Sequence, residues 1–186
     1  MSRIALAVSV VALLVGCARQ PNVSAAPALA PAAQVYAALL RPALAAGEQR
    51  LLVFDSTSAG EPGGSRFVPA RRAAFWAALP RGLAEQLDSA IRTPRALRAV
   101  GLPRWIQLID RREWAARLEA EARRGEIDLG SVYVVSPVVF SADSTAALVY
   151  MEQPCRGSCG RGAFYHLRRD SAGTWRLEAT EVAWRG

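Results

Sequence analysis

Three residues of this chain carry side chains suited to covalent or metal chemistry: Cys155, Cys159 and His166, the only histidine. The two cysteines lie four residues apart in a glycine-rich stretch that reads CRGSCGRG. In an oxidising compartment, this spacing predicts a local disulfide that shapes a hairpin loop. The alternative is a redox pair, although thioredoxin-like chemistry uses Cys-x-x-Cys at a helix N-terminus rather than Cys-x-x-x-Cys among glycines.

His166 adds two further alternatives, a metal site and a hydrolase. A zinc site needs four ligands, and His166 with the two cysteines supplies three at most. A catalytic triad would use His166 as its base, but Ser158 does not stand in a Gly-x-Ser-x-Gly motif. His166 alternates with Phe164 in a strand pattern, where a partly buried, hydrogen-bonded histidine is the ordinary outcome. We therefore expect no catalytic residue, no cofactor and no metal.

The N-terminal segment indicates the cellular compartment of the protein. Arg3 precedes an apolar run from Ile4 to Val15 that is too short for a membrane span and typical of a secretory signal peptide. The run ends in Leu14-Val15-Gly16-Cys17, which resembles the lipobox of bacterial lipoproteins. In that family a small residue precedes a cysteine that is lipidated and becomes the new N-terminus. The alternative is a plain signal peptide cut at a later small-residue site.

The lipobox resemblance implies that residues 1–16 are a signal peptide and that Cys17 carries the lipid. It places the protein in the cell envelope, facing the periplasm or the cell surface. The outer membrane is favoured over the inner membrane because Ala18, rather than Asp, follows the cysteine. With Cys17 taken by lipid in an oxidising compartment, we expect Cys155 and Cys159 to form a disulfide, since the glycines around them let the chain bend tightly.

Positive charge is concentrated in the middle of the chain. All 23 basic residues are arginine, against 16 acidic residues, for a net charge of +7. The basic segment, Arg66–Arg112, holds ten arginines and three acidic residues, whereas the part after Gly125 is near neutral. This segment predicts contact with anionic lipid headgroups or an anionic envelope polymer. The alternative is an ordinary solvated surface; nucleic acid is not expected as a partner of an exported chain.

The expected organisation is a tether followed by one domain. Residues 17–33 are rich in alanine and proline and predict a lipidated tether. Residues 34–186 predict a single α+β domain, with 34–126 mainly helical and 127–186 forming a four-stranded antiparallel β-meander onto which the helices pack. Pro137 should interrupt the first strand, and a bulge near Thr180 should reconcile the two halves of the last strand.

Two helices have clear local signals. Apolar residues recur every four positions from Leu79 to Ile91, which predicts one buried helical face. Asp110 with Glu113 three residues later matches a capping box, and Ile109 with Trp114 has the spacing of a hydrophobic staple. A helix should therefore begin directly after Asp110.

The C-terminal third matches a pattern of strands around the cysteine-rich stretch. Ser136 to Phe140 is followed by Ala147-Leu148-Val149-Tyr150, by the CRGSCGRG hairpin, and by Gly173-Thr174-Trp175 and Trp184. This region resembles an uncharacterised group of exported bacterial proteins with a Cys/Gly-rich hairpin and a terminal Gly-x-Trp…Trp strand. The resemblance implies the fold and export but supplies no catalytic residues.

We expect a lipid-anchored cell-envelope protein that acts as a non-catalytic binding or structural module. The first alternative is an envelope thiol-redox or other enzyme centred on Cys155, Cys159 and His166. The second is an inhibitor of an envelope or wall-degrading enzyme, which is disfavoured because such targets are usually basic and would repel a basic chain. Tyr165 and Trp184 are the two aromatic residues expected as possible ligand contacts.

Overall fold

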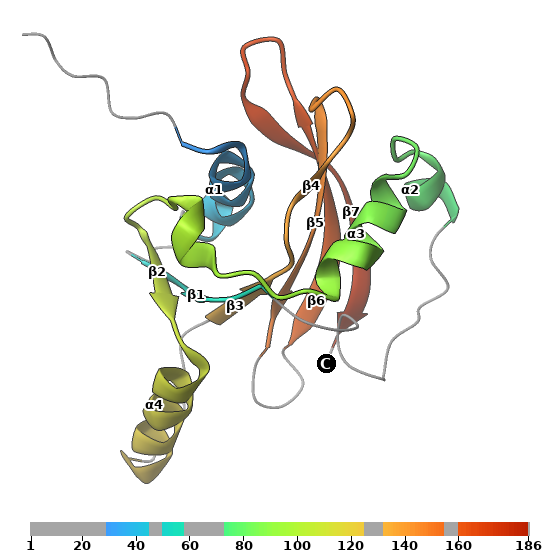
Figure 1. Ribbon diagram of the computed structural model, residues 1–186. Helices are drawn as coiled ribbons and strands as arrows, with labels where there is room; N and C mark the ends of the chain where they lie inside the picture. Colours follow the sequence, from blue (N-terminus) through green and yellow to red (C-terminus); the bar gives the residue numbers. More distant parts are fainter. Residues whose placement is uncertain (1–28, 45–49, 58–72, 125–131, 155–159, 186) are drawn as a thin grey trace, which may run out of the picture.

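Helices pack on both faces of one mixed β-sheet, an α+β architecture (Figure 1). The computed structural model describes residues 29–44, 50–57, 73–124, 132–154 and 160–185. In chain order these form α1 (Pro31–Leu44), β1 (Leu51–Phe54), α2 (Ala73–Ala77), α3 (Leu83–Ile91), the 3₁₀ helix η2 (Leu97–Val100), β2 (Ile106–Ile109), α4 (Arg111–Arg124), β3 (Val132–Val135), β4 (Val139–Phe140), β5 (Ala146–Gln153), β6 (Arg161–Arg169) and β7 (Trp175–Arg185).

The sheet is larger than the sequence predicted. The described residues hold seven strands, in the order β2-β1-β3-β5-β6-β7 with β4 paired to β5. β1 runs parallel to both β2 and β3, and the other pairs are antiparallel. The strands after residue 131 pair antiparallel in chain order, as predicted, but they do not form the whole sheet: two short strands that precede them, β1 and β2, extend it by parallel pairing, so the sheet is mixed rather than a four-stranded antiparallel meander. Parallel strands need a long connection rather than a hairpin turn, so their pairing has no local turn signal.

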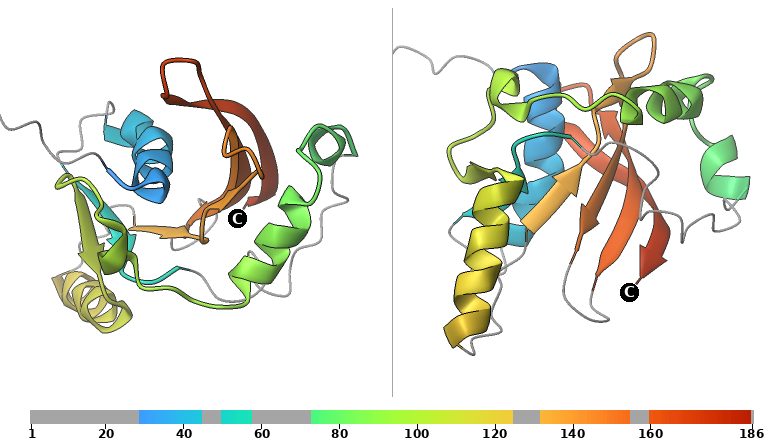
Figure 2. Two further views of the ribbon diagram at one scale, coloured as in Figure 1. Left: turned by 45° about the horizontal axis from the view of Figure 1, so that its top comes forward. Right: turned by 60° about the horizontal axis from the view of Figure 1, so that its bottom comes forward.

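The helix α1 covers one face of the sheet. Its buried side chains include Val35, Tyr36 and Leu40, which belong to one apolar cluster with Val53 of β1 and Val149 of β5. Figure 2 shows the strands β5 to β7 curving around α1. The helix begins at Pro31, so it includes the last three residues of the segment 17–33 that we assigned to the tether.

The helix α3 covers the opposite face. Leu83, Leu87 and Ile91 are buried and pack in one cluster with Leu148 and Tyr150 of β5, as the four-residue spacing predicted. The strand is interrupted between β3 and β4, where Pro137 lies, as the sequence predicted. The β6–β7 ladder shifts register at two places, on either side of Thr180, rather than at the single bulge expected near that residue.

The helix α4 begins directly after Asp110, as the capping signal predicted. The Asp110 Oδ1 atom accepts hydrogen bonds from the backbone N–H groups of Arg112 and Glu113, both at 2.8 Å. Trp114 packs in one cluster with Ile109 and Phe54, on the sheet face opposite α1. No α4 side chain is fully buried, and the helix projects from the domain (Figure 1). In the part of the chain that the structure describes, no helix combines the length and the apolar character needed to cross a membrane.

Candidate functional site

The predicted chemical residues fall into two groups. Cys17, Cys155 and Cys159 lie outside the described residues, so lipidation at Cys17 and the Cys155–Cys159 disulfide stay predictions. His166 lies in the middle of β6 and is well described. Among the described residues, no group of three or more His, Cys, Asp or Glu side chains is placed to hold a metal ion.

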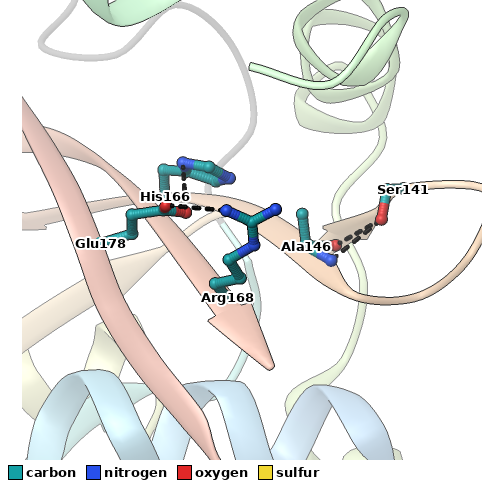
Figure 3. A network of polar contacts seen from close by, with 5 residues as sticks. All are labelled: Ser141, Ala146, His166, Arg168 and Glu178. Carbon is teal, nitrogen blue, oxygen red and sulfur yellow. Dashed lines mark hydrogen bonds and ion pairs between the residues drawn. The ribbon is translucent and has the colours of Figure 1, made fainter. Parts of the chain in front are cut away.

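His166 belongs to a polar cluster on the sheet face that α3 covers. Its register partner on β5 is Leu148, which packs against α3, and only 6% of the histidine is exposed. The imidazole Nδ1 lies 3.4 Å from Glu178 Oε2, and Arg168 Nη1 lies 3.1 Å from Glu178 Oε1, so both side chains converge on one carboxylate (Figure 3). The other ring nitrogen, Nε2, is buried and has no hydrogen-bond partner among the described residues.

Burial sets the charge of this histidine. Desolvation lowers the pKa of His166, the Glu178 carboxylate raises it, and the Arg168 guanidinium lowers it again. The net decrease keeps the imidazole neutral at pH 7. If Nδ1, which faces Glu178, holds the ring proton, Nε2 carries the lone pair, which is the arrangement of a general base oriented by a carboxylate.

The position of His166 along β6 separates it from the described ends of the cysteine hairpin. His166 is six residues from Gly160 in sequence, or roughly 20 Å along the strand at about 3.3 Å per residue. A centre built on His166 therefore draws its neighbours from β5 and β7 rather than from the start of β6.

A second polar cluster lies at the hairpin end of the same sheet face. The Tyr150 hydroxyl donates a hydrogen bond to Glu152 Oε2 at 2.7 Å and accepts one from Trp184 Nε1 at 2.8 Å. Tyr150 is fully buried, and burial together with the Glu152 charge raises its pKa. The sequence predicted Trp184 as a possible ligand contact but did not predict that Tyr150 and Glu152 would lie with it in one polar cluster. The two-residue spacing of Tyr150 and Glu152 places both side chains on one face of a strand.

The two aromatic residues expected as ligand contacts lie on opposite faces of the sheet. Trp184 packs at the margin of the α3 cluster, whereas Tyr165 is buried in the α1 cluster. The structure therefore does not bring them together, and any shared ligand would have to reach both faces.

The described arginines of the basic segment are all exposed. Only one of its seven described arginines forms an ion pair within the described residues: Arg98, whose guanidinium lies 3.8 Å from Asp55. In contrast, Arg168 and Arg176 of the β6–β7 ladder pair with carboxylates at 3.1 and 2.8 Å. The exposed arginines are Arg81, Arg92, Arg95, Arg98, Arg104, Arg111 and Arg112.

No family model, curated protein or solved structure matches the chain. The lipobox and the likeness of the C-terminal third to exported bacterial proteins therefore stay predictions from the sequence.

Proposed function

We propose that this protein is a lipid-anchored binding module of the cell envelope. The lipid on Cys17 would hold it at the membrane, and the arginines of the basic segment would contact anionic headgroups. The observation that carries the proposal is the number of exposed arginines without a carboxylate partner: six of the seven described arginines of the basic segment form no ion pair among the described residues, whereas Arg168 and Arg176 of the β6–β7 ladder each pair with a carboxylate.

The two attachments would reinforce each other. Leu29, where the described fold begins, lies twelve positions after Cys17, so the lipid keeps the domain within about 40 Å of the bilayer. Each arginine near an anionic surface contributes about 1 kcal/mol. Contacts that are weak in solution become significant at the high local concentration that an anchor provides.

The test of headgroup contact is vesicle flotation of a chain that begins at Ala18 and therefore lacks the lipid. This chain retains every described element, since the first of them starts at Pro31. We expect it to float with phosphatidylglycerol vesicles, not with phosphatidylcholine vesicles, and to be released as salt screens the charges. Equal flotation with both would refute headgroup contact. Binding to an anionic wall polymer without binding to vesicles would favour the polymer as the partner instead.

The test of the anchor is Cys17→Ala in the full-length chain. The variant should no longer incorporate a fatty-acid label and should leave the membrane fraction in high salt. A variant that is still labelled would contradict the anchor.

A second candidate function is an envelope thiol-redox or other enzyme centred on Cys155, Cys159 and His166. The contact between His166 and Glu178 favours an enzyme that uses this imidazole as its base. Because His166 lies roughly 20 Å along β6 from Gly160, such a base would act apart from the cysteines. Thiol titration of the folded, exported protein distinguishes the two functions. Catalytic thiols would cycle between oxidised and reduced forms, whereas a structural disulfide would stay oxidised.

A further inference from the structure

The carboxyl ends of the parallel strands β1 and β2 form one edge of the sheet. Phe54 and Ile109 are register partners at these ends, and each is followed directly by an aspartate, Asp55 and Asp110. The Asp55 N–H donates to the Ile109 carbonyl at 2.9 Å, which holds the two chains side by side at the point where they leave the sheet.

The connections at this edge lie on opposite faces of the sheet. The chain that leads into β2 passes through η2, whose Leu97 packs in the α1 cluster with Val53. The chain that leaves β2 enters α4, whose Trp114 packs with Phe54 on the other face. Because the Leu97 N–H donates to the Asp55 carbonyl at 2.8 Å, the start of η2 lies beside the carboxyl end of β1, so this end of the strand pair is flanked by η2 on one face and by α4 on the other.

Exposed guanidinium groups approach this edge from both connections. From η2, the Arg98 guanidinium lies 3.8 Å from the Asp55 carboxylate, and its side chain is 73% exposed. From α4, the Arg111 guanidinium lies 4.9 Å from the centre of the Phe54 ring. Arg112, the next residue of α4, is also exposed. The two guanidiniums thus contact consecutive residues of the chain at the end of β1.

The two aspartates at this edge do not occupy the hydrogen-bond donors of the arginine guanidinium groups. Asp110 is occupied by the N–H groups of the first turn of α4, so the helix end itself has little capacity left for an anion. Asp55 has only the long contact to Arg98. The donors available to an anion are therefore the guanidinium groups, whose planar fork matches the geometry of phosphate oxygens.

We propose that this edge is a phosphate site, at which Arg98, Arg111 and Arg112 bind the phosphate of an anionic lipid headgroup. The proposal rests on the headgroup contact proposed above and narrows it from a general basic surface to one place in the fold. The anchor places the chain at a membrane, which makes lipid phosphate the source of the ligand.

The test compares two double variants of the chain that begins at Ala18, each lacking two positive charges of the basic segment. R98Q/R111Q removes two charges at the sheet edge. The matched control R81Q/R92Q removes two exposed charges that lie just before and just after α3 in the chain. The edge variant should lose affinity for phosphatidylglycerol vesicles by about thirtyfold, and the control by less than about threefold. A third variant, R98K/R111K, keeps the charge but loses the planar fork, and should bind more weakly than the wild-type chain.

Thermal unfolding of all three variants checks that each is folded, and the lysine variant keeps the comparison informative if loss of the Arg111–Phe54 contact unfolds R98Q/R111Q. Equal losses in the edge and control variants would overturn the phosphate site while leaving headgroup contact intact. A wild-type chain that fails to bind vesicles would overturn both.

A competition experiment separates lipid surface from phosphate chemistry. Soluble glycerol phosphate, added at constant ionic strength, should release the wild-type chain from vesicles and should have no effect on the residual binding of R98Q/R111Q. Release no greater than that caused by chloride would overturn recognition of phosphate.

Discussion

Gly162 of β6 and Trp184 of β7 are register partners, and the edge of the indole occupies the space that a side chain at position 162 would need. A Cβ atom there would overlap both Trp184 Nε1 and the Tyr150 hydroxyl. The glycine is therefore a condition for the hydrogen bond that joins Trp184 to Tyr150.

Gly162→Ala should destabilise the protein by about 1–3 kcal/mol, because the new methyl group displaces two aromatic side chains from a packed site. Urea unfolding measures the change, and tryptophan fluorescence should report the movement of Trp184. The control is the same substitution in a Trp184→Ala background, where the destabilisation should fall by more than half. An equal effect in both backgrounds would contradict the packing argument.

His166 makes stability depend on pH. Its folded-state pKa lies below its ordinary value of about 6.5, so the unfolded chain binds the proton more readily. Its contribution is complete above about pH 6.5 and is lost as pH falls from there toward the folded-state pKa, by up to about 1.4 kcal/mol per pH unit. Urea unfolding at several values between pH 7.5 and 5.5 should show a steeper decline for the wild-type chain than for His166→Gln. Parallel profiles would contradict this account.

Asp110 should stabilise α4 through its two backbone contacts. Asp110→Ala removes the acceptor of the Arg112 and Glu113 N–H groups and should destabilise the protein by about 0.5–2 kcal/mol. Asp110→Asn keeps a capping oxygen and should recover most of the loss. Circular dichroism and thermal unfolding measure both variants, and equal effects of the two substitutions would show that the cap contributes nothing.

The cysteine pair should contribute little to global stability. The loop between Cys155 and Cys159 is short, so the entropy that its closure removes from the unfolded chain stabilises the fold by only about 2 kcal/mol. The exported protein should have an intact mass two hydrogens below that of the reduced form, and the double serine variant should remain folded. Free thiols in protein taken from the periplasm would contradict the disulfide.

Local signals in the sequence predicted local structure well. The cap at Asp110, the apolar spacing from Leu83 to Ile91 and the interruption at Pro137 each act within a few residues, so the sequence alone is enough to place them. Pairing between distant segments was missed. β1 and β2 have four residues each, and their parallel partnership depends on a 51-residue connection that carries no pairing signal.

The polar clusters depend on register between strands. Tyr150 meets Trp184 only because two register shifts in the β6–β7 ladder place the indole opposite Gly162. Neither shift can be positioned from residue types alone, since each moves the following side chains to the other face. The positions of Arg98 and Arg111 could not be predicted for the same reason. Both lie at one sheet edge, against Asp55 and Phe54, because β1 and β2 pair in parallel.

Hydrogen exchange of the lipidated protein in nanodiscs tests the central claim, contact between the basic segment and anionic headgroups, most directly. On nanodiscs containing phosphatidylglycerol, the amides between residues 92 and 112 should exchange more slowly than on phosphatidylcholine nanodiscs. The β6–β7 turn, residues 170–173, should exchange equally on both, since Arg176 beside it pairs with the Asp170 carboxylate. Identical exchange of residues 92–112 on the two lipids, or slowing confined to the β6–β7 turn, would contradict the account.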